Sequence, residues 1–223
     1  MGERRSVSLR IAYGRVSHFL QALLLMFAVL AAAPAAAQEV RILALGDSLT
    51  AGYGLSQGQG FVPQLERALR RNGIRARVTD GGVSGDTAAQ GRARLGWTLD
   101  GMGAKPDLVI VALGANDMLR GLPPERTRAD LDAIMAELQR RGIRTVIAGM
   151  LAAPNLGPVY GSTFNRIYPD LAAKYRAPLY PFFLDKVAGE KGVHLEDGIH
   201  PNFQGIKRMV SGILPTVEGA IGR

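Results

Sequence analysis

Short apolar segments alternate with amphipathic segments along most of the chain. Five apolar segments of strand length are predicted to form β-strands: residues 41–45, 76–79, 107–113, 145–150 and 179–183. The third contains the run Leu-Val-Ile-Val-Ala-Leu, the strongest strand pattern in the chain. A strand without polar alternation is typical of the middle of a parallel sheet, where both faces are covered.

Segments with apolar residues at helical spacing lie between these strands. Helices are predicted at residues 61–71, 87–99, 160–175 and 201–221, and another is opened by Pro123-Pro124 and closed by Gly142. Pro169 predicts a break or kink inside its segment. Pro215 and two glycines weaken the prediction for the last helix.

The alternation predicts a single α/β domain over residues 38–223. The expected architecture is a three-layer α/β/α fold with a doubly wound, mostly parallel, five-stranded sheet of the flavodoxin-like kind. In such folds the reactive groups gather outside the carboxyl ends of the strands.

The first 37 residues differ from the rest. Four arginines accompany an apolar run from Phe19 to Ala33, and Ala35-Ala36-Ala37 follows. This pattern predicts a signal peptide at residues 1–37, cleaved before Gln38, and therefore a periplasmic or secreted protein. The run is shorter than the roughly 20 residues that a membrane-spanning helix needs, so an uncleaved anchor is the less favoured alternative.

Composition and charge exclude several classes of site and partner. The sequence contains no cysteine, which excludes disulfides, thiolate nucleophiles and cysteine-bound metals. Removal of the predicted signal takes away four arginines and one glutamate, and so lowers the net charge from +8 to +5. No nucleic-acid-binding motif accompanies this charge, so no nucleic acid is expected as a partner. A transient contact with an anionic membrane surface is compatible with it.

A candidate nucleophile follows the first predicted strand, in Gly46-Asp47-Ser48-Leu49. Gly46 permits a sharp exit from the sheet, which presents Ser48 at its edge. A serine hydroxyl is a poor nucleophile unless a base removes its proton. The Gly-x-Ser-x-Gly elbow of α/β-hydrolases is absent, because Thr50 stands where its second glycine would be.

The base is sought among three histidines, of which His18 lies in the predicted signal. Asp197 precedes His200 by three residues, so a turn can place the carboxylate on one imidazole nitrogen and leave the other for Ser48. His194 has no such partner on its N-terminal side. We therefore predict Ser48, His200 and Asp197 as nucleophile, base and orienting acid.

Two further segments at predicted strand ends offer donors to an oxyanion. Gly85, in Ser84-Gly85-Asp86-Thr87, offers its backbone N–H, and Asn116, in Gly114-Ala115-Asn116-Asp117, offers its amide. The Ser48 N–H is a third donor. Taken singly, these segments also fit turns or a helix cap. Their joint occurrence at strand ends favours a catalytic site.

These four blocks, in this order, resemble those of the SGNH or GDSL hydrolases over about residues 40–220. The blocks are Gly-Asp-Ser-Leu-Thr at 46–50, Ser-Gly-Asp-Thr at 84–87, Gly-Ala-Asn-Asp at 114–117 and Asp-Gly-Ile-His-Pro-Asn at 197–202. The resemblance implies that Ser48, Gly85, Asn116 and His200 hold the family's functional positions. It also implies acyl transfer through a covalent intermediate, without a metal or organic cofactor.

Closer motifs resemble the bacterial thioesterase I, lysophospholipase and arylesterase branch. The motifs are Gly52-Tyr53-Gly54-Leu55, Gly91-x-x-Arg94-Leu95 and Ala153-Pro154-Asn155-x-Gly157 with Tyr160. The resemblance implies a small-molecule ester, thioester or lysophospholipid substrate, and we expect a monomer. One departure is Asp80, which stands where many relatives carry asparagine; we expect altered turn support with catalysis retained.

Apolar side chains in loops near the predicted site are candidates to line an acyl groove. They are Met118, Leu119, Leu156 and Tyr160, together with Leu122 and Val159. Each of them also fits ordinary packing at the core or at a helix edge.

Two other functions stay open. A carbohydrate O-deacetylase on the same scaffold needs aromatic sugar-binding surfaces, and the single tryptophan, Trp97, makes it less favoured. A non-catalytic periplasmic binding module would leave Ser48, Asp197 and His200 without a role, and a phosphate-binding glycine loop is lacking.

Overall fold

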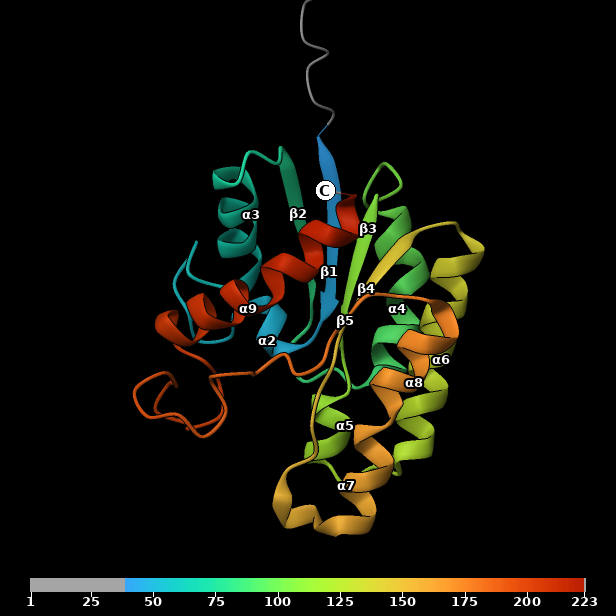
Figure 1. Cartoon of the computed structure of the whole chain (residues 1–223), viewed down its shortest axis with the longest axis vertical. Coiled ribbons are helices and arrows are strands. Elements are labelled where there is room, and N and C mark those ends of the chain that lie inside the picture. The colour runs from blue at the N-terminus through green and yellow to red at the C-terminus, as the bar shows by residue number, and fades with distance from the viewer. Residues whose placement is uncertain (1–38, 223) are drawn as a thin grey trace, which may run out of the picture. The chain divides into compact units, whose positions relative to one another are not determined.

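Residues 39–222 are described by a computed structural model of the chain (Figure 1). They belong to one compact unit. The signal peptide predicted at residues 1–37 lies outside the described residues. Within them, no helix combines the length and the apolarity needed to cross a bilayer.

A five-stranded parallel sheet forms the middle layer. Its strands are β1 (Val40–Gly46), β2 (Ala76–Gly82), β3 (Leu108–Ala112), β4 (Arg144–Ala148) and β5 (Leu179–Tyr180). The strand order is β2-β1-β3-β4-β5, and every neighbouring pair is parallel. This is the flavodoxin-like order, in which the direction of winding switches between β1 and β3. It confirms the predicted fold class.

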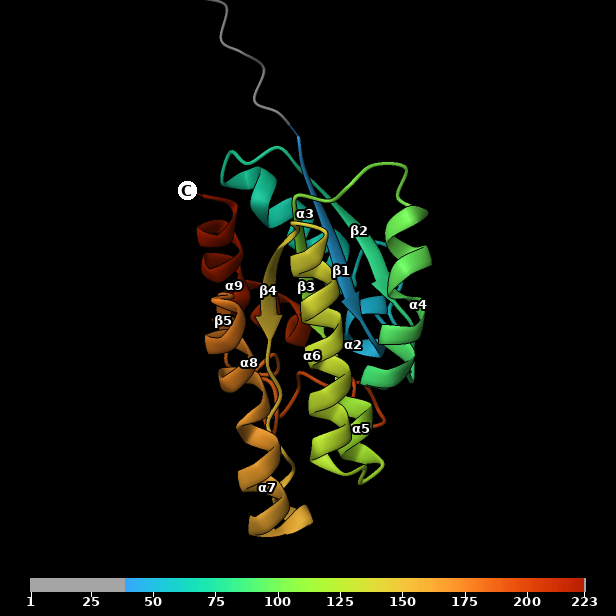
Figure 2. The same cartoon turned by 90° about the vertical axis from the view of Figure 1, so that its right-hand side faces the viewer.

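Helices cover both faces of the sheet. They are α2 (Ser48–Ala51), α3 (Phe61–Arg71), α4 (Ala88–Asp100), α5 (Ala115–Leu119), α6 (Pro124–Arg140), α7 (Gly157–Asn165), α8 (Ile167–Tyr175) and α9 (Phe203–Ile221), with a 3₁₀ turn, η1 (Pro154–Leu156). Helices α3 and α9 pack together over one face, and α4 and α6 pack together over the other, with α8 beside α6 (Figures 1 and 2).

The register of the strands sets where the site forms. Gly46 at the end of β1 pairs with Gly82 of β2 on one side and with Ala112 of β3 on the other. Three strands therefore end side by side, and the segments that follow them leave from one edge. Every residue of β3 is buried, as expected for a central strand. The short helices α2 and α5, which begin within three residues of these strand ends, were not predicted.

Prolines account for two differences from the predicted helices. The segment predicted as one helix over residues 160–175 is two helices, α7 and α8, which meet at Arg166. The break that Pro169 predicts inside this segment is present, three residues before the proline, so that Pro169 lies in the first turn of α8, where its missing N–H removes no helical bond. Pro215 lies inside α9 without ending it. Buried Ile213 and Val217 hold the helix against the core on either side.

Gly82 leaves no room for a side chain at the edge of the sheet. A Cβ added there would lie closer than 3.0 Å to backbone atoms of Ala51 and Asp47, which flank the first turn after β1. The close approach of β2 to α2 therefore requires glycine at this position.

We expect Gly82→Ala to lower the free energy of unfolding by about 1–3 kcal/mol, because backbone must move to admit the methyl group. Urea denaturation would measure the change. Gly161→Ala is the matched control: its Cβ would meet nothing within 4 Å, so this helical position gains alanine's higher propensity. An unfolding free energy of Gly82→Ala equal to that of the wild type would contradict the packing argument.

Candidate active site

Ser48 is the first residue of the four-residue helix α2, directly beyond the end of β1. The Asp47 carboxylate caps this helix by accepting the Leu49 N–H at 3.0 Å. The turn is so tight at Gly46 that a Cβ there would collide with the side chain of Thr50. Strand, glycine and cap together fix the position from which the serine hydroxyl projects.

Asp197 and His200 are held in one tight turn. Oδ1 of Asp197 accepts the N–H groups of Ile199 and His200 at 2.8 and 2.9 Å. Oδ2 lies 2.6 Å from Nδ1 of the imidazole. These hydrogen bonds, led by that from the His200 N–H, lower the pKa of Asp197 to about 2. The carboxylate is therefore ionised at neutral pH and favours a proton on Nδ1.

The imidazole of His200 reaches Ser48 across 152 residues of chain. Nε2 lies 3.0 Å from the serine Oγ. The ring of Tyr53 lies against the imidazole, with centroids 4.4 Å apart, a contact that the sequence did not indicate. His194 turns its Nδ1 instead to a backbone carbonyl four residues earlier. The structure thus brings together Ser48, His200 and Asp197 as hydroxyl, imidazole and carboxylate.

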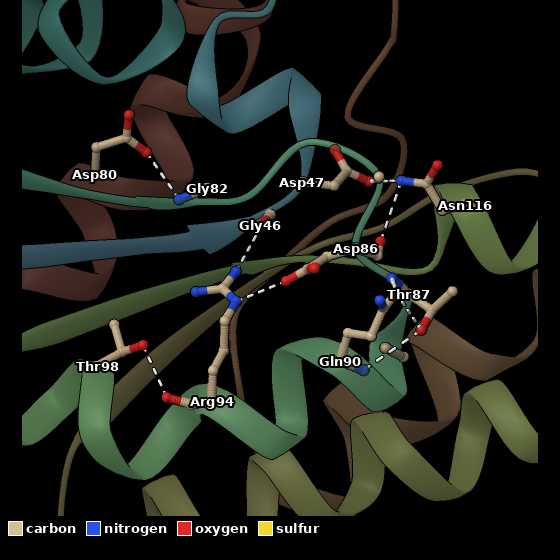
Figure 3. A network of polar contacts seen from close by, with 12 residues as sticks. Gly46, Asp47, Asp80, Gly82, Asp86, Thr87, Gln90, Arg94, Thr98 and Asn116 are labelled. Carbon is tan, nitrogen blue, oxygen red and sulfur yellow. Dashed lines mark hydrogen bonds and ion pairs between the residues drawn. The ribbon is translucent and has the colours of Figure 1, made fainter.

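The expected oxyanion donors also lie at this edge of the sheet. The amide of Asn116 donates to Oδ2 of Asp47 at 3.2 Å and to the backbone oxygen of Asp86 at 3.1 Å (Figure 3). Gly85 has a φ of 87°, in the left-handed region that favours glycine. Within residues 39–222, the N–H groups of Ser48 and Gly85 donate to no protein acceptor. Both are therefore available to a ligand.

A buried ion pair supports this edge from below (Figure 3). Nε of Arg94 lies 2.6 Å from Oδ2 of Asp86, and its Nη2 donates to the backbone oxygen of Gly46 at 2.9 Å. The two side chains are only 10% and 8% exposed. Arg94 therefore ties the end of β1 to the segment that carries Gly85. From the other side, Arg120 donates to the Gly85 carbonyl at 2.7 Å.

Asp47 is a buried carboxylate next to the candidate nucleophile. Its burial raises its pKa from 3.8 to about 6, although hydrogen bonds from Leu49 and Asn116 oppose the shift. Among the described residues, no group of three or more histidine or acidic side chains is arranged to hold a metal ion.

The Asp80 carboxylate hydrogen-bonds to the backbone of its own turn. Its Oδ1 accepts the Gly82 N–H at 2.8 Å, within the last residues of β2 (Figure 3). Burial raises the pKa of Asp80.

The six predicted groove residues occupy different environments, and Val159 is the most exposed of them at 80%. Met118 is buried in the core, with 7% exposure, and so offers little surface to a ligand. Leu119 is 57% exposed. Leu156 and Tyr160 are half-buried at the core edge, and the Tyr160 hydroxyl donates to the carbonyl of Leu122 at 2.9 Å. Their role in binding an acyl chain stays a prediction.

The sequence matches the GDSL-like lipase/acylhydrolase family over residues 44–208. Esterase TesA of Pseudomonas aeruginosa is 38% identical over 190 residues, which make up 85% of this chain and 92% of the relative. Thioesterase 1/protease 1/lysophospholipase L1 of Escherichia coli K12 is 36% identical over 177 residues, or 79% and 82% of the two chains.

Solved structures show the same likeness. The crystal structure of AlinE4, described as an SGNH-hydrolase family esterase, is 47% identical to this chain and superposes with a TM-score of 0.71. The superposition covers 83% of this chain and 98% of AlinE4.

We expect Arg94→Met to lower the free energy of unfolding by about 3–5 kcal/mol, because it leaves the Asp86 carboxylate buried without its partner. Adding Asp86→Leu should recover much of the loss. Arg92 lies on the same helix as Arg94 and forms an exposed ion pair with Asp130 of α6, so Arg92→Met is the control and should cost about 1 kcal/mol or less. Similar unfolding curves for Arg94→Met and Arg92→Met would contradict this.

Asp47→Asn should alter how stability depends on pH. Because the pKa of Asp47 is raised to about 6, the folded protein binds more protons than the unfolded chain between about 4 and 6, and its stability falls as pH rises through that range. Asparagine does not titrate, so Asp47→Asn does not lose stability in this way. Between about pH 4 and pH 6, the free energy of unfolding of the variant should therefore rise relative to that of the wild type by about 3 kcal/mol. Unfolding at several pH values would measure it. The exposed Asp185→Asn serves as control, and a parallel trend in both variants would refute the prediction.

Proposed function

Because this chain belongs to the GDSL-like lipase/acylhydrolase family and is an ester hydrolase, we propose that it cleaves carboxylic esters and thioesters with Ser48 as nucleophile. One observation carries the proposal. The Ser48 hydroxyl, the His200 imidazole and the Asp197 carboxylate form a hydrogen-bonded series, with separations of 3.0 and 2.6 Å. This is the order in which a base must lie between a nucleophile and an orienting acid.

The first step forms an acyl-enzyme. His200 accepts the Ser48 proton at Nε2 while Oγ attacks the carbonyl carbon of the substrate. The imidazolium that results is stabilised by Asp197, which stays ionised because its pKa is lowered to about 2. His200 then gives its proton to the leaving alcohol or thiol as the acyl–oxygen or acyl–sulfur bond breaks.

The oxyanion of each tetrahedral intermediate is proposed to rest on three donors: the Ser48 N–H, the Gly85 N–H and the Asn116 amide. Two of these N–H groups lack a protein acceptor among the described residues. The Asn116 amide makes bonds of 3.2 Å to the Asp47 carboxylate and 3.1 Å to the neutral Asp86 carbonyl, and a negatively charged oxygen is a stronger acceptor than that carbonyl. Such preorganised donors stabilise charge that develops during the reaction.

In the second step, water replaces the leaving group. His200 removes a proton from the water as it attacks the acyl-enzyme, and returns the proton to Ser48 when the acid departs. None of these steps requires a metal or an organic cofactor.

We propose acyl esters, thioesters and lysophospholipids as the substrate class. The names of the relatives, an esterase and a thioesterase 1/protease 1/lysophospholipase L1, support it. Leu119, Leu156 and Tyr160 are proposed to contact the acyl chain. We also propose that residues 1–37 direct export to the periplasm or beyond and that the hydrolase domain begins at residue 38.

We expect Ser48→Ala to lower kcat/KM on p-nitrophenyl butyrate by about 10⁴-fold or more, because the attacking oxygen is lost. His200→Gln should have a comparable effect, and Asp197→Asn should cost about 10³–10⁴-fold by disturbing the imidazole. Initial rates with purified protein would measure each change.

His194→Gln and Ser162→Ala are matched controls. They change a histidine and a serine that bond to nearby backbone carbonyls and take no part in the Ser48–His200–Asp197 series. Both should retain wild-type rates. Retained turnover in Ser48→Ala would overturn the assignment of the nucleophile. Wild-type turnover of acetylated sugars alone would favour the O-deacetylase, and no turnover of any acyl substrate would favour a binding module.

A further inference from the structure

Two basic hollows lie on either side of helix α9. One, of about 500 Å³, is lined by the segment before α9 and by α9 itself, and its cations are Lys186, Lys191, Lys207 and Arg208. The other, of about 330 Å³, lies between α3 and α9, and its cations are Arg67, Arg71 and Lys207. Among residues 39–222, no carboxylate lines either hollow. We call the surface formed by these six cations the basic face.

The basic face and the catalytic histidine belong to consecutive segments of chain. In Figure 1, α9 crosses in front of the sheet with α3 beside it, and the orange segment before α9 leads into it. Asn202 caps α9, two residues after His200. His200 therefore lies between the segment that carries Lys186 and Lys191 and the helix that carries Lys207 and Arg208.

Most charges on this face are not neutralised by the protein itself. Within residues 39–222, Lys186, Lys191 and Arg71 lie in no ion pair, and Lys207 only approaches the ring of Phe203, at 5.9 Å. The nearest carboxylate to Arg208 is 3.9 Å away, a weak and exposed contact.

Over the opposite face of the sheet, several cations are paired at short range. Arg92, Arg128 and Lys174 each meet an aspartate at 2.7 to 3.0 Å. The two hollows beside α9 therefore gather cations that are mostly without short-range ion pairs, an arrangement that favours an anionic partner.

Exposed apolar side chains accompany these charges at the mouth of the site. Tyr53, which packs on the His200 ring, is 52% exposed, and Ile199 is 53% exposed. Phe203, 39% exposed, opens α9 and lines one of the two hollows. Aromatic and aliphatic side chains beside lysines and arginines suit the headgroup region of a membrane, where the apolar groups enter and the cations meet phosphates.

We propose that the basic face docks the protein on an anionic lipid surface, with Tyr53, Ile199 and Phe203 at headgroup depth. The mouth of the site then opens toward the lipid, so an acyl chain can pass directly from membrane to enzyme. This consequence rests on the proposed function, whereas the docking itself does not require catalysis.

The test measures co-sedimentation of the full chain with vesicles of phosphatidylcholine, with and without phosphatidylglycerol. We expect binding only to the anionic vesicles, weakened by added salt. A triple variant, Lys186→Gln, Lys191→Gln and Lys207→Gln, should bind on the order of a hundredfold more weakly, because each basic residue near the surface contributes roughly fivefold. Hydrolysis of p-nitrophenyl butyrate by this variant should match the wild type.

The matched control removes three exposed cations elsewhere: Lys105→Gln, Arg126→Gln and Arg166→Gln. Its net charge equals that of the test variant and its residues 1–38 are unchanged, so wild-type vesicle binding is expected. Ser48→Ala should also bind as the wild type, which separates docking from catalysis.

Equal losses in the two triple variants would overturn the proposal, as would equal binding of the wild type to neutral and anionic vesicles. Binding to duplex DNA without binding to anionic vesicles would assign the face to a nucleic acid instead.

Discussion

Backbone hydrogen bonds that hold β1 in parallel register between β2 and β3 bring together groups far apart in the chain. Gly46 lies level with Gly82 and Ala112, so the three chain segments that follow leave the sheet at one edge. A one-residue slip of β1 would turn its side chains to the opposite face and carry Ser48 away from the imidazole. The chemistry therefore depends on the sheet before it depends on any catalytic side chain.

Two carboxylates, those of Asp86 and Asp47, are buried beneath that edge and are stabilised in different ways. Asp86 is compensated by a guanidinium at 2.6 Å, which also holds the last carbonyl of β1. Within residues 39–222, Asp47 forms no ion pair and accepts from neutral donors, and its burial raises its pKa to about 6. One carboxylate fixes the backbone and the other orients the amide of Asn116. Both act on the positions of the proposed oxyanion donors without contacting a substrate.

Local patterns predicted the sheet, the long helices and the Asp197–His200 turn, because each depends on periodicity or on residues close in sequence. What they missed depends on contacts between distant segments. Nothing near Tyr53 indicates that its ring packs on an imidazole 147 positions later. Helices α2 and α5 are too short to show a period. Met118, expected in a groove, has the same apolar character whether it faces a ligand or the core, and burial alone separates the two.

The turn that carries the imidazole differs in anchoring from the sheet that carries the serine. Residues 196–199 are exposed, and the turn is closed chiefly by the Asp197 bonds and by the Leu195 N–H to the His200 carbonyl. β3 and residues 42–46 of β1, in contrast, are buried in the core. Segments with few buried contacts open locally at a smaller free-energy cost than the whole fold. Warming should therefore abolish catalytic activity by opening this turn while the central strands are still folded. Cooling should restore the activity without refolding of the sheet.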